Sequence, residues 1–281
     1  MQFKYINLTI AFIIAITLPN RMDVLQAIIL GTVQGITEWL PISSEGINSL
    51  ILTTFYNQTL ADAIYISIWL HIGTVLAATI YFRKTILKLI KNLPHYSGKQ
   101  TPYNKITNFI LISLFATGLV GLPILLFGID KLNFQGSTAT AFIGLLLIIT
   151  GLLQIKTKSA SQKKQPTIFD SFLVGIAQGF SGLPGLSRSG LTVSTLLLRN
   201  YTAQQALTLS FLISIPTILG AEIILILTSK VLVTPQLIIA TITAFVTGLL
   251  SIHIFMRMAQ KINFGYFCIF LGLISMIPLL L

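Results

Sequence analysis

Cysteine is almost absent from this chain, and that absence removes two classes of protein at once. Cys268 is the single cysteine in 281 residues and lies within an apolar run. A disulfide framework within the chain is therefore excluded, and a zinc cluster built on thiolates is implausible. We interpret Cys268 as a small residue that faces lipid or the core.

Charged residues are also scarce, at 9% of the chain against 54% hydrophobic residues, and the mean hydropathy is +0.88. This composition excludes an ordinary soluble domain. Several apolar runs reach the length of about 20 residues that a membrane-spanning helix needs. The sequence therefore predicts an all-α integral membrane protein, which we treat as a single membrane domain over residues 1–281.

Acidic residues are the scarcest charged class, with seven Asp and Glu against 18 Lys and Arg, which gives a formal net charge of +11. A charge of this sign can indicate a nucleic-acid partner. We reject that function because the lysines cluster in short loops between apolar runs and no basic face is interleaved with aromatic residues. The bias is typical of cytoplasmic loops, with attraction to anionic membrane lipid.

Two apolar stretches are interrupted, and six are not. Glycine, proline and polar residues break 24–56 and 168–198, so we expect re-entrant hairpins there, which need protein or a water-filled cavity around them. We expect uninterrupted spans at 62–82, 106–127, 137–155, 205–228, 232–256 and 263–281. A further apolar segment at 5–18 predicts an extra N-terminal helix, and a start at Met22 is the alternative.

The second interrupted stretch, residues 175–190, reads GIAQGFSGLPGLSRSG. It places Ser181, Ser187, Arg188 and Ser189 within apolar surroundings, where an arginine is costly and indicates a function. Glycines and Pro184 break the helix and free backbone N–H groups. Hydroxyls, free N–H groups and one guanidinium together predict an anion site suited to phosphate.

The first interrupted stretch, residues 31–46, reads GTVQGITEWLPISSEG and aligns with the second without gaps. Gln34 falls on Gln178 and Ser43 on Ser187, at an offset of 144 residues (175 − 31). Such a duplication predicts two repeats, 22–155 and 156–281, after the extra segment 1–21, with a binding site at their interface. Each half would hold one re-entrant hairpin and three transmembrane helices.

Loop charges predict that the two halves are inverted. If 83–105 lies inside the cell, the inside loops hold six, four and two basic residues, and the two outside loops hold one each. That distribution obeys the positive-inside rule. It sends the first hairpin into the membrane from outside and the second from inside.

The two motifs together carry a family resemblance. QGITEWLPISSEG, followed later by PGLSRSGLT, resembles the signatures of the undecaprenyl-diphosphatase (bacitracin-resistance) family, and LHIGT at 70–74 and SFLISIPTILGA at 210–221 also match. The resemblance covers Met22 to the C-terminus. It implies a multi-pass enzyme of the cell membrane that hydrolyses the terminal phosphate of a polyprenyl diphosphate in lipid-carrier recycling.

The resemblance also implies a set of site residues. Glu38 matches an acidic position needed for activity and tied to a divalent cation, Mg or Ca, which Gln34 would help to hold. Ser43 and Ser44 match a serine pair, and Ser44 is our candidate nucleophile. We expect catalysis by Glu38, Ser44, Glu45 and Arg188, and substrate binding by Ser43, Gly185, Ser187, Ser189 and Thr192.

One position departs from the family pattern. The histidine that usually follows the glycine of the first motif is replaced by Ile47, which cannot move a proton. Glu45 is one candidate substitute base and His71 is another, although a lone histidine on a span is more often a core residue. For Glu222 we favour an ordinary carboxylate near the outer interface beside Lys230 over one that lines a cavity.

The sequence leaves three functions open. A phosphatase is the one we favour. A transporter or flippase of prenyl phosphate is the first alternative, because broken half-helices in an inverted repeat are also a transporter plan. A relative that binds the lipid diphosphate without cleaving it is the second. We also expect membrane lipid as a partner, with a homodimer as an option.

Overall fold

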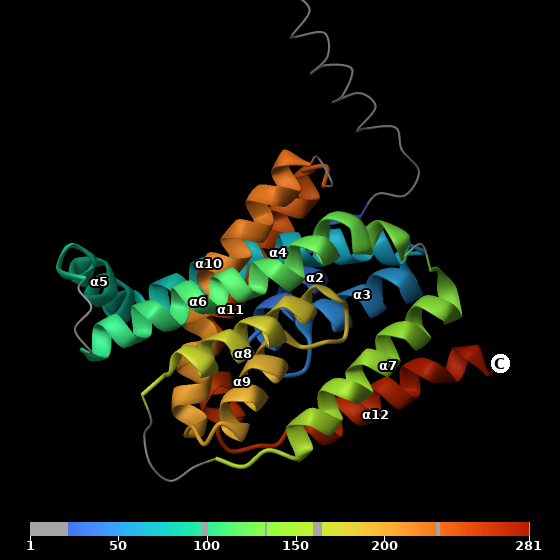
Figure 1. Ribbon diagram of the computed structural model, residues 1–281. Helices are drawn as coiled ribbons and strands as arrows, with labels where there is room; N and C mark the ends of the chain where they lie inside the picture. The colour runs from blue at the N-terminus through green and yellow to red at the C-terminus, as the bar shows by residue number, and fades with distance from the viewer. Residues whose placement is uncertain (1–21, 97–100, 133, 160–164, 229–230, 281) are drawn as a thin grey trace, which may run out of the picture.

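The computed structural model describes residues 22–96, 101–132, 134–159, 165–228 and 231–280, and within these ranges every regular element is a helix (Figure 1). The predicted N-terminal helix at 5–18 lies outside the described residues. The α-helices are α2 (Val24–Thr37), α3 (Ser44–Phe55), α4 (Leu60–Tyr81), α5 (Arg83–Asn92), α6 (Pro102–Pro123), α7 (Gly136–Ile155), α8 (Ile168–Gly179), α9 (Arg188–Leu198), α10 (Ala203–Leu227), α11 (Pro235–Ala259) and α12 (Gly265–Met276).

Five of these helices are long and apolar enough to cross a membrane: α4, α6 with its extension to Lys131, α7, α10 and α11. The sixth expected span corresponds to a shorter apolar helix, Gly265–Leu279. Their outer faces are apolar as well. On α6, for example, Leu111, Phe115 and Leu119 follow one another at every fourth position and are exposed. A continuous exposed apolar stripe of this kind is stable in lipid and not in water.

The two interrupted stretches form the predicted hairpins of short helices. The first breaks between Thr37 and Ser44, around Pro41, and the second breaks between Gly179 and Arg188, around Pro184. Serine caps the returning helix in both cases: the Ser43 hydroxyl accepts from the N–H of Gly46 and the Ser187 hydroxyl from that of Gly190. The duplicated serine thus satisfies a backbone donor at each helix start, which the apolar surroundings would leave unpaired.

The hairpins enter the bundle from opposite ends. Leu60, just after the first hairpin, donates its N–H to the carbonyl of Phe134 at 3.0 Å, beside the start of α7. Ala203, just after the second hairpin, donates to the hydroxyl of Ser159 at 2.9 Å, beyond the end of α7. Since α7 runs the length of the bundle between these points, the hairpin openings lie at its two ends. The repeat boundaries and the side that faces the cytoplasm stay predictions.

Each hairpin packs against a long helix of the other half of the chain, α2 on α11 and α8 on α6. The duplicated glycines make these contacts possible. A Cβ atom at Gly35 would lie 2.7 Å from the backbone nitrogen of Gly248, and one at Gly179 would lie 3.1 Å from that of Gly121. The backbones are therefore in direct contact, which is how small residues hold helices together in a membrane.

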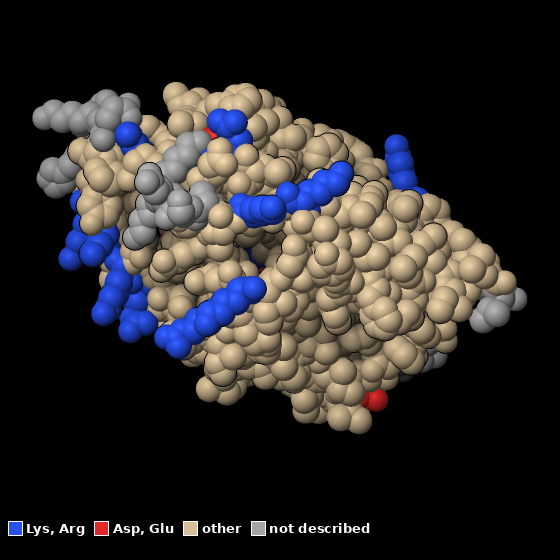
Figure 2. Space-filling model, turned by 90° about the horizontal axis from the view of Figure 1, so that it is seen from below, with Lys and Arg blue, Asp and Glu red and all other residues tan. Residues whose placement is uncertain are grey.

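Helix α5 lies in the segment 83–105, for which the sequence predicted only a basic loop. Its apolar residues divide into Ile86 and Leu89, which pack on the core or are buried, and Leu87 and Ile90, which are exposed. The helix also carries Arg83, Lys84, Lys88 and Lys91, and it projects at one end of the bundle (Figure 1). Lys and Arg side chains gather around that end and on both sides of a central hollow (Figure 2).

Asp170 anchors the second hairpin at its open end. Its carboxylate is fully buried and accepts from Arg199 Nε at 2.6 Å and from the Tyr201 hydroxyl at 2.8 Å. Burial and the neighbouring carboxylate raise the pKa of the Tyr201 hydroxyl, so it stays a proton donor. These contacts join α8 to the end of α9 and hold the hairpin closed.

We expect Asp170→Ala to lower the free energy of unfolding by about 1–3 kcal/mol, because it removes the carboxylate that the buried Tyr201 hydroxyl and the partly exposed Arg199 contact. The measurement is the apparent melting temperature of the purified protein in detergent. Asp62→Ala is a matched control, since Asp62 also accepts from a Thr at a helix start but is exposed. Equal shifts in the two variants would contradict the anchoring role.

Candidate active site

The tips of the two hairpins meet inside the bundle. The Ser43 hydroxyl, which caps α3, also accepts from the N–H of Gly185 in the second hairpin at 3.2 Å. The Ser189 hydroxyl donates in the opposite direction, to the carbonyl of Leu40 at 3.2 Å. Gly185 has φ of 102°, a conformation that favours glycine, so its role in the structure is to shape the turn. Side chains of both motifs therefore share one small space.

Glu38 lies at the centre of that space, at the end of α2, and four side chains donate to it. Arg188 forms an ion pair with Oε1. The other oxygen, Oε2, lies 2.7 Å from the Ser44 hydroxyl, 3.0 Å from Gln34 Nε2 and 3.2 Å from His71 Nε2. The donors come from α2, α3, α4 and α9. The carboxylate thus joins both hairpins to a spanning helix.

His71 is one of the two candidate substitute bases, and it lies at the site. Its Nε2 contacts Glu38 and its ring lines the pocket between the hairpin tips, so His71 is not an ordinary core histidine. Its Nδ1 lies 2.8 Å from the carbonyl oxygen of Ser67. A carbonyl only accepts, so Nδ1 carries a proton and Nε2 faces the site. A titratable side chain on an apolar span was the available signal.

Arg188 is the first residue of α9 and points toward the first hairpin. One of its terminal nitrogens, Nη2, bonds Glu38, and its guanidinium carbon lies 5.6 Å from the centre of the Phe211 ring. The other terminal nitrogen, Nη1, is buried and has no partner among the described residues. A buried guanidinium N–H group without a partner is expensive, so this group is suited to an anionic ligand.

The remaining predicted residues divide by what their side chains contact. Ser43, Ser44, Glu45, Ser187 and Ser189 line the pocket. Thr192 does not line it: its hydroxyl bonds the Arg188 carbonyl at 2.8 Å and the Ser210 hydroxyl at 2.6 Å. We therefore assign Thr192 to packing of α9 on α10, a correction to the expected substrate contact.

Three further positions are Ile47, which replaces the family histidine, and the carboxylates Glu45 and Glu222. Ile47 packs against Leu40, Ile42 and Cys268. Glu45 lines the pocket, and its Oε1 is buried without a partner in the described part of the chain. Glu222 is 4% exposed and neither of its oxygens has a partner among the described residues, and its place near the outer interface stays a prediction. Lys230, its expected neighbour, lies outside the described residues.

The expected divalent-cation ligands are engaged with each other and with neighbours. Both Glu38 oxygens accept from protein donors, and Gln34 Oε1 accepts from Asn48 Nδ2 at 2.8 Å. Among the described residues no group of three or more His, Cys, Asp or Glu side chains could hold a metal ion. Gln34 and Glu38 in this arrangement do not fit a cation, so we route no chemical step through one.

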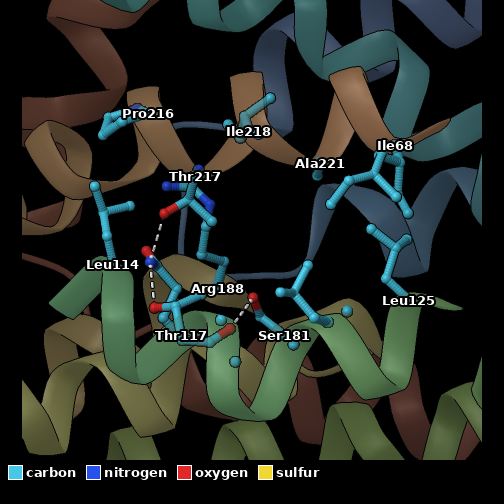
Figure 3. Close-up of a pocket in the computed structure, with 18 of the residues that line it drawn as sticks. Ile68, Leu114, Thr117, Leu125, Ser181, Arg188, Pro216, Thr217, Ile218 and Ala221 are labelled. Carbon is cyan, nitrogen blue, oxygen red and sulfur yellow. Dashed lines mark hydrogen bonds between the residues drawn. The ribbon is translucent and has the colours of Figure 1, made fainter. Parts of the chain in front are cut away.

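The polar pocket adjoins an apolar cavity of about 250 Å³. Glu45, His71, Ser181 and Arg188 line both. The cavity lies between α10, which contributes Pro216, Thr217, Ile218 and Ala221, and α6 with the turn after it, which contribute Leu114, Thr117 and Leu125 (Figure 3). An apolar cavity with charged groups at one end is suited to an amphiphile with an anionic head.

The geometry supports phosphoryl transfer. A guanidinium with a free N–H group can neutralise developing charge on phosphate oxygens, and a serine hydroxyl bonded to a carboxylate is an activated nucleophile. The hydroxyls of Ser43, Ser187 and Ser189 and an imidazole complete the constellation. Such groups act strongly here because the site is buried away from water.

Comparison with known proteins agrees with this chemistry. A model of the family described as bacitracin resistance protein BacA matches residues 27–277. Undecaprenyl-diphosphatase of Methanococcoides burtonii is 47% identical over 91% of this chain and 98% of its own length. Proteins of the same name from Methanothrix thermoacetophila and Haloarcula marismortui are 38% and 35% identical, over 91% and 89% of this chain and 96% and 94% of their own lengths. The chain is thus a multi-pass membrane protein that belongs to the bacitracin resistance protein BacA family.

Proposed function

We propose that the protein is a polyprenyl diphosphate phosphatase, a hydrolase that releases the terminal phosphate and leaves a polyprenyl monophosphate. One observation supports this most: Arg188 and Ser44 both contact Glu38, in the polar pocket that adjoins the apolar cavity. The name of the similar proteins, undecaprenyl-diphosphatase, agrees with this function. We place the activity in the cell membrane, with membrane lipid as partner and without nucleic acid. A homodimer stays a prediction.

In the proposed first step, Ser44 Oγ bonds to the terminal phosphorus while the bond from that phosphorus to the bridging oxygen breaks. The hydroxyl proton passes to Glu38 Oε2, which it already contacts at 2.7 Å. The bridging oxygen leaves with the prenyl phosphate and takes the proton of His71 Nε2. Arg188 Nη1 donates to the phosphate oxygens that gain charge.

In the second step, a water oxygen bonds to the same phosphorus and its proton goes to His71 Nε2. The bond from phosphorus to Ser44 Oγ breaks, and Ser44 recovers its proton from Glu38. Free phosphate is the product and every group returns to its starting state. His71 acts as acid and then as base, the general pattern of a double displacement.

The position of His71 beside Glu38 bears on the transport alternative. The strongest sequence argument for a flippase is that position 47 lacks a histidine and that binding without hydrolysis could persist. His71 lies 3.2 Å from Glu38, so the site has an imidazole from another helix. No other observation on the described residues favours transport over hydrolysis.

Replacing His71 by glutamine should reduce kcat for phosphate release by about 100-fold, the lower range for a lost general acid–base group. Glutamine can still donate to Glu38 but cannot exchange a proton, so a merely structural histidine would tolerate it. His71→Asn instead keeps a donor to the Ser67 carbonyl, and its kcat should fall to the same extent as in His71→Gln. Near-normal kcat in His71→Gln, or no rescue of His71→Gly by added imidazole, would exclude proton transfer.

The test of the function itself is direct. Purified protein in detergent should release inorganic phosphate from a prenyl diphosphate, with prenyl monophosphate as the second product. Movement of intact lipid across sealed vesicles without phosphate release would instead establish a transporter. Repeating the assay with a chelator tests the divalent-cation prediction, which the arrangement of Gln34 and Glu38 does not support.

A further inference from the structure

A second polar cluster lies on the wall of the apolar cavity, outside the hairpin tips. Gln178 on α8 bridges two threonines, Thr117 on α6 and Thr217 on α10, and all three line the cavity (Figure 3). Its amide nitrogen donates to the Thr117 hydroxyl at 3.0 Å and to the Thr217 hydroxyl at 2.8 Å. Gln178 is 1% exposed. The proposed phosphoryl-transfer chemistry does not use this cluster.

The hydrogen bonds around the cluster fix which way the amide points. Each threonine hydroxyl has one proton, and both are used: Thr117 donates to the carbonyl of Gly175 at 3.0 Å and Thr217 to that of Ile213 at 2.8 Å. Both hydroxyls can therefore only accept from Gln178. The NH₂ group supplies two protons and satisfies both, whereas the amide oxygen in its place would satisfy neither.

The orientation leaves one atom unused. Gln178 Oε1 is buried and has no partner among the described residues. An unpaired buried acceptor is unfavourable, so the position favours a ligand that donates a hydrogen bond. Gln178 lines the same cavity as Arg188, and Ser181, whose hydroxyl donates to the backbone carbonyl of Gln178 at 2.6 Å, lines both this cavity and the polar pocket.

The duplicated partner of Gln178 behaves differently. Gln34 occupies the same position in the first motif, but its nitrogen donates to Glu38 and its oxygen accepts from Asn48. Both amide atoms of Gln34 therefore have a hydrogen-bond partner in the protein, whereas in Gln178 only the nitrogen does. The two halves of the chain have diverged at this pair, and only one copy keeps an acceptor for a ligand.

We propose that Gln178 Oε1 accepts a hydrogen bond from the P–OH group of a phosphate monoester or free phosphate. This inference rests on the proposed function. An isoprenoid chain carries no donor, and a fully ionised phosphate oxygen is repelled by the amide oxygen. A phosphate with a second pKa of about 6 keeps one P–OH group in its singly ionised form. The cluster would then hold the product in that form beside Arg188.

Product inhibition of phosphate release tests the proposal, with prenyl monophosphate as the inhibitor. In the wild-type protein its Ki should fall about tenfold from about pH 8 to about pH 5.5, as the P–OH group forms and gains one hydrogen bond. In Gln178→Met, which keeps the size and removes the acceptor, the change should shrink to about twofold or less. An unchanged pH response in this variant would overturn the proposal.

A second comparison needs no variant, so it holds even if Gln178→Met fails to fold. Prenyl methyl phosphate carries the same single charge as the protonated monoester but has no P–OH group. The wild-type protein should bind it about tenfold more weakly than prenyl monophosphate at about pH 5.5, and equal binding would contradict the inference. Inorganic phosphate in the same assay shows which product the oxygen contacts.

Ligand binding also separates this inference from the proposed function. Thermal stabilisation of the purified protein by prenyl monophosphate can be measured whether or not the protein hydrolyses the diphosphate. Failure to release phosphate would refute the activity. Loss of the P–OH preference with activity intact would refute only the role of Gln178.

Discussion

Arg188→Ala should reduce phosphate release from a prenyl diphosphate by at least about 10³-fold, the lower range for an arginine that stabilises a phosphoryl-transfer transition state. The guanidinium is the only Arg or Lys side chain among the described residues that lines the polar pocket. Its Nη1 has no described partner and its Nη2 bonds Glu38. Without it, charge that develops on the phosphate has no permanent cation. The measurement is kcat/KM for phosphate release.

Two further variants serve as controls for that result. Arg188→Lys keeps the charge but loses the planar fork, so its activity should lie between those of wild type and alanine. Arg83→Ala removes an exposed arginine that donates to the Ile80 carbonyl and does not line the polar pocket. Its activity should stay within about twofold of wild type. Robust activity in Arg188→Ala would refute the mechanism, and folding is checked by size-exclusion elution and melting temperature.

Ser44→Ala should cause the other large loss, about 10⁴-fold or more, since removal of a nucleophile leaves only binding and electrostatic stabilisation. The Ser44 hydroxyl donates to Glu38 Oε2 at 2.7 Å, whereas Ser43 caps α3 and accepts from Gly185. Brief incubation with substrate labelled at the terminal phosphorus should give a labelled wild-type protein, and mass spectrometry should locate the label on Ser44. The alanine variant should remain unlabelled.

Ser43→Ala is the matched control for that experiment. It removes the neighbouring hydroxyl and a helix cap, so stability should fall by about 1 kcal/mol and activity by a smaller factor than in Ser44→Ala. The Ser43 variant should still form the labelled intermediate. Loss of the label in Ser43→Ala would show that Ser43 is the nucleophile, and full activity in an unlabelled Ser44→Ala would show that water attacks the phosphate directly.

Much of the architecture could be predicted from residue patterns alone. Proline, glycine and polar residues clustered inside apolar stretches predicted both hairpins, whereas a single proline such as Pro216 lies within the continuous helix α10. The gapless overlay of the two motifs predicted a binding site where the two halves meet, and the ion pair between Arg188 and Glu38 joins the two motifs. The scarcity of acids made Glu38 and Glu45 conspicuous. These inferences rest on local conformational rules and on the cost of charge in lipid, and neither depends on how helices are rotated.

The lateral contacts between helices could not be predicted in this way. His71 and Glu222 are single polar residues on apolar spans, and periodicity does not say which neighbour each one faces. Helix rotation is set by backbone contacts such as Gly35 on α11 and Gly179 on α6, which join residues far apart in the chain. Helix α4 lies against the same helix α11 through Gly73, and His71 on α4 thereby meets Glu38 at the end of α2. In the same way, only tertiary packing distinguishes Gln178 from its duplicate Gln34.

The sequence by itself thus determined the class of protein, the two hairpins and the residue types of the site, because these follow from composition and from where helices break. Tertiary structure alone decided which imidazole serves Glu38 and which amide oxygen is left for a ligand. The physical reason is that a hydrogen bond needs two groups within about 3 Å, and in a helical bundle that separation depends on close packing between distant segments.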